Sequence, residues 1–369
     1  MKKVLFVASV TRHINTFHIP YLRYFKNKGY EVHVASNGEE SIKYCDKHFQ
    51  IEFERSPLKI KNIKAYKKLK KIIEKENYNI IHCHTPVASV LTRLAAKKMK
   101  KRGTKVIYTA HGFHFFKGAP LKNWILFYPI EKYLSKYTDT LITINEEDYE
   151  FAKRKFKKTN VKHIHGIGID SSKFNFDMSE KERNEFREKL SVGPLDFLLM
   201  YAAELNNNKN QKMLIDAIKI LVNKYPNIKL LLAGTGIYKE RLEKQIRKNL
   251  LQSNVLLIGY RTDIPKLLKI SDLYVATSKR EGLPVNILEA MISGLPLVVT
   301  DSRGQRELVD DGKNGYIIKI GDVQDLVQRI ENIYLDARIR DHIVENAKNN
   351  IDKYLLDNVI KEMSNIYNA

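Results

Sequence analysis

The chain alternates short, apolar, β-branched segments with longer segments in which lysines and apolar residues recur at helical spacing. In the first half the apolar segments are KVLFVAS, EVHVAS, NIIHCH, KVIYTAH and DTLITIN, and in the second half they are FLLMYAA, KLLLAG, NVLLIGY, DLYVATS and PLVVT. Strands that are apolar on both faces are typical of parallel sheets covered by helices. The alternation therefore predicts an α/β protein with two successive doubly wound, Rossmann-like sheets.

A break in this alternation separates two predicted domains, which suits a chain of 369 residues. The segment HGIGIDSSKFNFDMSEKERNEF is rich in Gly, Asp and Ser, as connections are, and it places the boundary near residues 170–190. We expect an N-terminal domain over 1–175 and a C-terminal domain over 185–349. A C-terminal helix at about 350–369 is expected to pack back on the first domain.

Ligands of doubly wound sheets bind beyond the carboxyl ends of the strands. Here those ends carry polar residues and glycines, namely Ser9 to His13, His84, His111, Ala203 to Lys209, Gly234 to Gly236, Tyr260 to Arg261, Ser278 to Glu281 and Thr300 to Arg303. Two domains that face each other across a cleft would bring these ends together. We therefore expect a protein with two substrates, one on each domain.

Positive charge is concentrated in the first half of the chain. Residues 1–175 contain 35 Lys and Arg against 15 Asp and Glu, a net charge of +20, whereas residues 176–369 contain 29 against 27. An asymmetry of this size favours an anionic partner for the first domain, such as nucleic acid, acidic lipid or a phosphorylated ligand. A merely solubilising, lysine-rich surface is the alternative.

The sequence predicts a cytoplasmic protein. Its start, MKKVLFVASV, is basic and then apolar, but Thr11, Arg12 and His13 interrupt the run and no small-residue cleavage site follows. No apolar stretch approaches the ~20 residues of a membrane span. Cys45 and Cys83 are too few and too far apart to indicate a disulfide framework or a zinc site.

Residues 278–300, SKREGLPVNILEAMISGLPLVVT, hold two glutamates in an otherwise nearly uncharged segment. Glu281 falls in a predicted loop and Glu289 on the second turn of the helix that follows, with Pro284 as its first residue. Free backbone N–H groups from Gly282 to Asn286 would suit a phosphate. Carboxylates suit the diols of a ribose and of a sugar, so the pattern indicates a nucleotide-sugar site. Two acids stabilised by the helix dipole are the alternative.

The segment EGLPVNILEA resembles the E-x7-E motif of the retaining glycosyltransferases of family 4, whose architecture is called GT-B. Other matching segments are the first strand, the HG after KVIYTA, GID…F at the connection, L-x-x-x-K-N after FLLMYAA, G-x-G after KLLLAG, GYR-x-D and G-x-x-ELVDDGKNGY. Each is weak alone, but their order and spacing are specific, and the resemblance covers most of the chain. Residues 4–38 also resemble the capsule and exopolysaccharide branch of the family.

The resemblance implies roles for residues of the second domain. Glu281 would contact hydroxyls of the donor sugar, Glu289 would hold the ribose and Lys209 would hold the diphosphate. The other expected donor residues are Gly282, Leu283, Pro284 and Val285 at the helix start, Gly234 and Gly236 in the turn after KLLLAG, Tyr260 and Arg261 beside the base, and Glu307. A plain strand-to-helix turn is an almost equally good interpretation of the two turn glycines, and Lys209 could instead cap its loop.

Histidines end two strands of the first domain. The resemblance places His111 near the reactive end of the donor sugar, as a catalytic residue with Glu281 and Lys209, because an imidazole can orient a hydroxyl or move a proton. A buried core histidine is the alternative. His84 and His82 form an H-x-H pair that looks metal-like, but the sequence offers no evident third ligand. We interpret His84 as a structural or acceptor-side residue.

One departure from the family pattern lies at the diphosphate clamp. In AAELNNNKNQK, Lys209 fits the lysine of the clamp, but Glu204 occupies the position of its arginine. The charge of the leaving diphosphate must still be stabilised as the glycosidic bond breaks. We therefore expect Arg280 or Arg303 to provide the missing positive charge.

A second departure follows the first strand. The family commonly has a Gly-Gly pair there, which lets the backbone approach the diphosphate, whereas this chain has SVTRHINTF. We expect a differently placed loop. Its side chains Thr11, Arg12, His13 and Asn15 are expected to face the acceptor.

The sequence contains no Asp-x-Asp pair, which metal-dependent transferases of the other common fold use to hold a divalent cation on the diphosphate. We therefore expect no metal site and no cofactor. The resemblance implies a metal-independent transfer in which the anomeric configuration is retained.

Aromatic and apolar residues accompany the lysines of the first domain. They occur in IKAYKKLKKIIEKEN, where Ile63, Tyr66, Leu69 and Ile73 have helical spacing, and in FHFFKGAPLKNWILFYPIEKYLSKY, which holds the one tryptophan, Trp124; KKMKKR adds further charge. Such segments suit contact with an anionic bilayer, although ordinary packing of amphipathic helices is the alternative. We expect peripheral attachment to the inner face of the cell membrane.

The resulting prediction is a retaining hexosyltransferase of capsule, exopolysaccharide or cell-surface glycan synthesis. It would move a sugar from a nucleotide-diphosphate sugar, expected to be a UDP-sugar, to an undecaprenyl-diphosphate-linked or other lipid-linked acceptor. A GT-B sugar-nucleotide epimerase, which needs no acceptor, is the closest alternative. A nucleic-acid binder explains the charge but not E-x7-E, and a nicotinamide enzyme lacks its G-x-G-x-x-G after the first strand.

Overall fold

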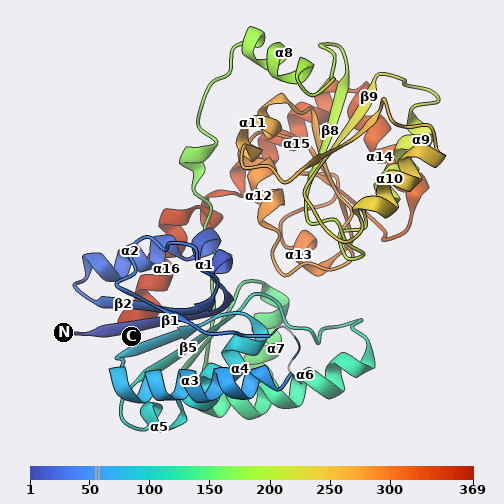
Figure 1. Cartoon of the computed structure of the whole chain (residues 1–369). Coiled ribbons are helices and arrows are strands. Elements are labelled where there is room, and N and C mark those ends of the chain that lie inside the picture. Colours follow the sequence, from blue (N-terminus) through green and yellow to red (C-terminus); the bar gives the residue numbers. More distant parts are fainter. Residues whose placement is uncertain (55, 57–58) are drawn as a thin grey trace. The chain divides into compact units, whose positions relative to one another are not determined.

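The computed structural model describes residues 1–54, 56 and 59–369 and contains two compact units (Figure 1). Unit 1 comprises residues 1–167 together with 359–369, and unit 2 comprises residues 168–358. Each unit is built on one sheet whose described strands all pair in parallel. The predicted α/β class with two Rossmann-like sheets is therefore confirmed.

The sheet of unit 1 has seven strands and reverses its order at β1. In spatial order the strands are β3 (Lys47–Gln50), β2 (Glu31–Asn37), β1 (Lys3–Val10), β4 (Ile80–Cys83), β5 (Lys105–Ala110), β6 (Thr140–Thr143) and β7 (Asn160–His163). Strand β1 pairs with β2 on one side and with β4 on the other, where Val7 is opposite Cys83. The carboxyl ends of β1 and β4 thus flank the point at which the strand order reverses, the usual ligand position in this architecture.

Helices cover both faces of this sheet. They are α1 (Thr11–Phe17), α2 (Ile19–Asn27), α3 (Lys61–Glu76), α4 (Pro86–Ala95), α5 (Lys97–Lys100), α6 (Leu121–Leu134), α7 (Glu146–Lys155) and α16 (Leu356–Asn368), with a 3₁₀ turn at Ser135–Tyr137. Figure 1 shows α1, α2 and α16 on one face and α3, α4 and α6 on the other. The inward side of α3 consists of Ala65, Leu69 and Ile73, whereas Ile63 is 57% exposed. Of the residues expected to form the apolar face of this helix, Leu69 and Ile73 do face inward, whereas Ile63 faces solvent.

The last helix of the chain, α16, packs on unit 1. The hydroxyl of Tyr367 lies 2.9 Å from Nδ1 of His82 on β4, and Lys105 Nζ donates to the carbonyl of Ile366 at 2.7 Å. Glu362 accepts from the backbone N–H of His165 at 3.0 Å. These contacts join the end of the chain to the sheet formed by its beginning.

The sheet of unit 2 has six strands and also reverses its order near the middle. In spatial order they are β10 (Val255–Gly259), β9 (Ile228–Ala233), β8 (Phe197–Ala202), β11 (Leu273–Ala276), β12 (Leu297–Thr300) and β13 (Tyr316–Ile318). Strands β8 and β11 pair with Leu199 opposite Leu273 and Met200 opposite Tyr274. The loops after β8 and β11 are therefore neighbours at the reversal point.

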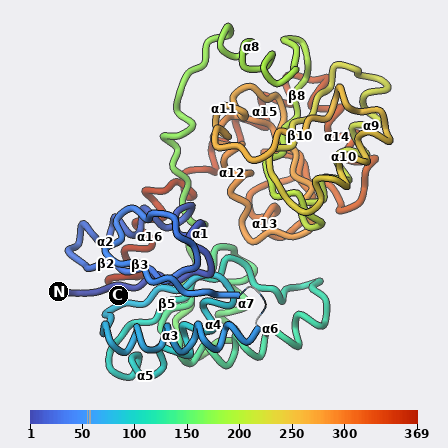
Figure 2. Tube along the Cα trace, viewed as in Figure 1, coloured from blue at the N-terminus to red at the C-terminus, as the bar shows by residue number. Residues whose placement is uncertain are grey.

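The helices of unit 2 are α8 (Glu180–Glu188), α9 (Gln211–Leu221), α10 (Lys239–Lys248), α11 (Ile264–Ile270), α12 (Val285–Ile292), α13 (Arg303–Arg306), α14 (Val323–Leu335) and α15 (Ala337–Asn349), with 3₁₀ turns at Ser171–Lys173 and Asp352–Tyr354. Helix α9 packs beside α10 and α14, whereas α11 packs beside α8 and α12 beside α15 (Figure 2). Among the described residues, no helix combines the length and apolar character that a membrane crossing requires.

All ten predicted strands are present, but three others were not predicted. These are β3, β7 and β13, each at an edge of its sheet. Residues Lys47–Gln50 and Asn160–His163 are exposed or half-buried throughout, so neither has the continuous apolar run of a central strand. A continuous apolar run indicates a strand that is buried on both faces. These edge strands are not buried in that way and lack the run.

A buried ion pair joins α4 to α6 in unit 1. Both terminal nitrogens of Arg93 donate to the carboxylate of Glu131, at 2.7 and 3.1 Å, and the side chains are 1% and 10% exposed. The guanidinium also lies 4.1 Å from the ring centre of Tyr108 on β5. Because two desolvated charges satisfy each other here, this pair sets how α6 lies on the unit.

Candidate active site

In unit 2 the loops after β8 and β11 meet at the point where the strand order reverses. The backbone N–H of Lys279 donates to the carbonyl of Asn208 at 2.8 Å, and Asn208 Nδ2 donates to the carbonyl of Arg280 at 2.9 Å. Between these contacts, Nζ of Lys209 lies 2.6 Å from Oε1 of Glu281. The predicted diphosphate lysine and the predicted sugar-facing glutamate, 72 residues apart in the chain, are thus brought together.

Glycines line the approach to this pair. A Cβ on Gly234 would lie 2.0 Å from the carbonyl oxygen of Ala203, and one on Gly236 would lie 2.3 Å from that of Leu205. Gly234 also has a φ of +148°, which strains any other residue. A Cβ on Gly304 would lie 2.6 Å from the carbonyl oxygen of Gly282. The backbone is therefore packed too closely for side chains beside the pair.

Helix α12 begins one residue later than predicted, at Val285, with Pro284 as its N-cap. No side chain caps this end, so its first N–H groups remain available to a ligand. Asn286 Nδ2 donates to the carbonyl of Ala202 at the end of β8, at 3.1 Å. That bond holds the helix start beside the Lys209 loop, where Gly282 is half-buried and Leu283 is 8% exposed. The arrangement supplies backbone donors and a lysine to one anion.

The predicted ribose residue, Glu289, projects from the second turn of α12. Burial raises the pKa of its carboxyl to about 7. Near neutral pH the group is thus divided between its charged and uncharged forms, and both can accept a hydrogen bond from a diol. Its environment suits a neutral hydroxylated ligand better than an anionic one.

The arginine position of the clamp remains an acid with an exposed side chain, Glu204. Of the two arginines expected to compensate, Arg303 is 7% exposed and its Nε donates to the carbonyl of Glu281 at 3.4 Å. Arg280 is exposed, in the same loop as Glu281. Arg280 thus precedes Glu281 in its loop, whereas Arg303, the first residue of α13, contacts Glu281 directly.

Three other predicted donor residues follow β10 and α13. Tyr260 is 60% exposed, and Arg261 forms an ion pair with Asp263, with Nε at 2.8 Å from Oδ1. Glu307 follows α13, and its backbone N–H donates to the carbonyl of Arg303 at 3.2 Å. The backbone N–H of Gly234 donates to the carbonyl of Gly259, which connects the β10 loop to the glycine turn.

Two supporting residues of this site were not predicted. Gln305, fully buried, accepts from Thr300 Oγ1 and Ser302 Oγ at 2.9 Å each and donates to the carbonyl of Ala276 at 3.1 Å. Tyr201 holds the Lys209 loop, because its hydroxyl lies 3.2 Å from the Lys209 carbonyl and 2.7 Å from Ser278 Oγ. A polar residue that ends an apolar strand run, as Tyr201 does in FLLMYAA, is the signal that could have indicated it.

In unit 1 the segment after β1 is a helix, α1, and not the expected loop. The hydroxyl of Thr11 is fully buried, 2.9 Å from Ser36 Oγ and 3.0 Å from the carbonyl of Gly38, so it offers no surface to a substrate. Asn15 donates to the carbonyl of Ser41 at 3.1 Å, and Arg12 is exposed. The polar residues expected to face one ligand thus point in different directions, as the helical spacing requires.

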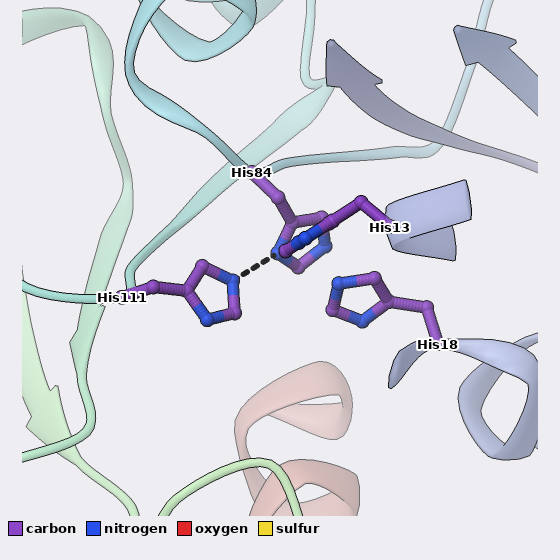
Figure 3. A group of neighbouring side chains, drawn as sticks. All are labelled: His13, His18, His84 and His111. Carbon is purple, nitrogen blue, oxygen red and sulfur yellow. Dashed lines mark hydrogen bonds between the residues drawn. The ribbon is translucent and has the colours of Figure 1, made fainter. Parts of the chain in front are cut away.

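The histidines of unit 1 do come together (Figure 3). Nε2 of His111, after β5, lies 3.4 Å from Nδ1 of His84, after β4. The ring of His13 on α1 is centred 5.0 Å from that of His111. His18, which was not predicted, stacks on His84 at 3.8 Å between ring centres. His82 points elsewhere, to Tyr367 and to Thr109 Oγ1 at 2.8 Å.

Two family models match the two halves of the chain. Residues 3–145 match the model described as glycosyl transferase 4-like, and residues 182–350 match the model described as glycosyl transferases group 1. The chain is also 45% identical to EpsD of Bacillus subtilis (strain 168), which is named as a glycosyltransferase, over 100% of this chain and 97% of that protein. The chain therefore belongs to the group 1, family 4-like glycosyltransferases, which confirms the resemblance.

Two further relatives are also named as glycosyltransferases. The UDP-Gal:alpha-D-GlcNAc-diphosphoundecaprenol alpha-1,3-galactosyltransferase of Escherichia coli is 28% identical over 83% of this chain and 79% of its own length. The capsular polysaccharide biosynthesis glycosyltransferase CapM of Staphylococcus aureus is 25% identical over 95% of this chain and 94% of its own length. The expected kinship with capsule and exopolysaccharide glycosyltransferases is thus confirmed.

Solved structures share the fold. The crystal structure of HepE of Anabaena in complex with UDP and glucose superposes on this chain with a TM-score of 0.83. The match covers 100% of each of the two chains, with 21% sequence identity. At this identity the likeness establishes the fold alone, and it confirms the GT-B assignment.

Proposed function

We propose that this glycosyltransferase moves a hexosyl group from a UDP-sugar to a lipid-linked sugar acceptor in capsule or exopolysaccharide synthesis. The observation that carries the proposal is the contact between Lys209 and Glu281 at the reversal point of the unit 2 sheet. A lysine suits the diphosphate, and a carboxylate beside it suits the hydroxyls of the attached sugar. The helix start at Val285 and Glu289 would serve the phosphates and the ribose.

The choice of donor and acceptor rests on similarity. The solved HepE structure is a complex with UDP and glucose, and the E. coli relative is named for UDP-Gal and a diphosphoundecaprenol-linked GlcNAc. For this chain we infer the same classes, a UDP-sugar and a lipid diphosphate sugar. The net charge of +20 over residues 1–175 favours an anionic acceptor on unit 1.

We further propose that transfer retains the anomeric configuration and needs no metal ion on the donor diphosphate. Lys209, the start of α12 and Arg303 would together stabilise the leaving UDP, because preorganised donors can replace a cation there. His111 would lie near the reactive end of the sugar. An epimerase, which converts the donor sugar without an acceptor, would not need the positive charge of residues 1–175.

Incubation of the protein with UDP-glucose, UDP-galactose or UDP-N-acetylglucosamine tests this function. We expect the mass of an added GlcNAc-diphospholipid to rise by one sugar residue with at least one donor, and NMR of the product to show the donor's own α configuration. Conversion of a donor to its epimer without acceptor would replace this proposal by the epimerase alternative. An inverted product would contradict retention alone.

We also propose that unit 1 docks on an anionic bilayer through α6, at the inner face of the cell membrane. The inward side of α6 carries Trp124 and Leu134, whereas Leu121, Ile125 and Leu126 are 72%, 68% and 49% exposed. Lys122, Lys132 and Lys136 are exposed on the same helix or directly after it. Apolar residues flanked by lysines suit insertion at the boundary between headgroups and acyl chains.

Replacing Leu121, Ile125 and Leu126 together by serine is expected to weaken binding to vesicles with anionic lipid by at least about tenfold, because three apolar side chains no longer enter the bilayer. Vesicle sedimentation measures the effect. Leu250→Ser with Leu335→Ser, at residues of unit 2 that are 81% and 62% exposed, is the matched control and should bind normally. Equal binding by the triple variant would exclude α6 as the docking surface.

A further inference from the structure

Four histidines from separate segments converge at the carboxyl edge of the unit 1 sheet (Figure 3). His13 lies on α1, His18 between α1 and α2, His84 directly after β4 and His111 directly after β5. One ring nitrogen from each can be chosen so that all four lie within 4.8 Å of one another. Two of them, Nε2 of His111 and Nδ1 of His84, are 3.4 Å apart. Ligands on a tetrahedral Zn²⁺ ion with Zn–N bonds of about 2.0–2.1 Å are separated by about 3.3–3.4 Å.

The cluster contains buried nitrogens without hydrogen-bond partners. Among the described residues, Nε2 of His13, both ring nitrogens of His18 and Nε2 of His84 are buried and have no partner. His18 and His84 are only 2% and 1% exposed. A buried polar atom without a partner costs about 1–3 kcal/mol, so several in one place call for a ligand.

Two fully buried histidines of the same unit, His33 and His82, do not share this feature. Nδ1 of His33 lies 2.8 Å from the hydroxyl of Tyr78, and its Nε2 lies 2.8 Å from Glu31. His82 likewise has partners on both nitrogens, at 2.9 and 2.8 Å. These two core histidines are thus satisfied by hydroxyls and a carboxylate, in contrast to His13, His18 and His84.

We propose that His13, His18, His84 and His111 bind one divalent transition-metal ion of the Zn²⁺ type. Imidazole is a ligand of choice for such ions, whereas Mg²⁺ and Ca²⁺ take oxygen ligands. Four protein ligands complete a tetrahedral shell, which is typical of a metal that holds structure and does not itself activate a substrate. From His13 and His18 the ion would accept lone pairs of nitrogens that otherwise have no partner.

Such an ion would join α1 and the ends of β4 and β5, which border the reversal point of the sheet. It would therefore fix the edge on which we expect the acceptor. Each imidazole binds the metal through one nitrogen, so His111 would keep its other nitrogen for a substrate hydroxyl. The proposed site lies on unit 1, and it departs from our expectation from the sequence that the chain has no metal site.

Titration of the untagged full chain with Co²⁺ tests the proposal without reference to activity. We expect about one Co²⁺ per chain, with the intense visible absorption of a tetrahedral ion, and displacement of that absorption by Zn²⁺. Added Zn²⁺ should also raise the melting temperature, because the native state alone holds the assembled ligands. Absence of stoichiometric binding by the unmodified protein would overturn the proposal.

Substitution assigns the ligands. His18→Gln is expected to weaken Co²⁺ binding at least tenfold and to abolish the Zn²⁺-dependent rise in melting temperature. His48→Gln is the matched control, because Nε2 of His48 already has a partner in Ser36 Oγ at 2.9 Å and lies outside the cluster. A folded His18→Gln protein that binds Co²⁺ as tightly as the unmodified chain would refute the assignment.

Discussion

Lys209→Ala is expected to lower kcat/KM for sugar transfer by about 10²–10³-fold, the range found when a group that stabilises developing charge is removed. Nζ of Lys209 lies 2.6 Å from the carboxylate of Glu281, and the Lys209 loop is held in place by Tyr201 and Asn208. As the glycosidic bond breaks, negative charge grows on the leaving diphosphate. Alanine removes the ammonium that would face this charge, so most of the loss should appear in kcat.

Initial-rate measurements with a saturating acceptor would provide kcat and KM for the donor. Lys212→Ala is the matched control, since Lys212 is the second residue of α9 but is exposed and paired with Asp216 at 2.8 Å. Its activity should be unchanged. Rates within about twofold of the unmodified protein for Lys209→Ala would mean that the helix start and Arg303 suffice for the leaving group.

Glu131→Ala is expected to lower the free energy of unfolding by about 3–5 kcal/mol, because Arg93 would remain as an uncompensated buried charge. Arg93 is 1% exposed and donates two hydrogen bonds to Glu131. The substitution also releases α6 from α4, so the effect should include weaker vesicle binding through the helix proposed as the membrane contact. Urea denaturation followed by circular dichroism measures the free energy.

Lys212→Ala, which removes the exposed pair with Asp216, is the control and should change stability by less than about 1 kcal/mol. The double substitution Arg93→Met with Glu131→Leu should recover most of the loss, because it removes both charges and fills their space. If Glu131→Ala lowered the free energy of unfolding no more than the control does, Arg93 would have to bind another partner or contact water in the variant.

The positions of the residues proposed for the donor were largely predictable, because these residues lie in short motifs at the ends of strongly apolar strands. Glu281, Glu289 and Lys209 were placed in sequence by spacing, and the parallel sheet brings the β8 and β11 loops together whatever the details of packing. What spacing could not predict was the direct contact of Lys209 with Glu281. That contact depends on side-chain directions within two loops.

The acceptor side was less predictable. A missing Gly-Gly pair indicated a different loop after β1, whereas the chain forms helix α1 there and buries Thr11. Helical spacing then directs His13 toward the end of β4 and Asn15 toward Ser41. A change of local structure over seven residues thus redistributes all the side chains expected to share one ligand.

The alternation of apolar and polar segments by itself determined the two parallel sheets and the order of their strands along the chain, because burial on both faces of a strand is recorded in its composition. The edge strands β3, β7 and β13, the contact of Arg303 with Glu281 and the convergence of four histidines were decided only by tertiary structure. His18 shows the reason. It is separated from His84 and His111 by 66 and 93 residues, and only the parallel pairing of β1, β4 and β5 brings their carboxyl ends to one place.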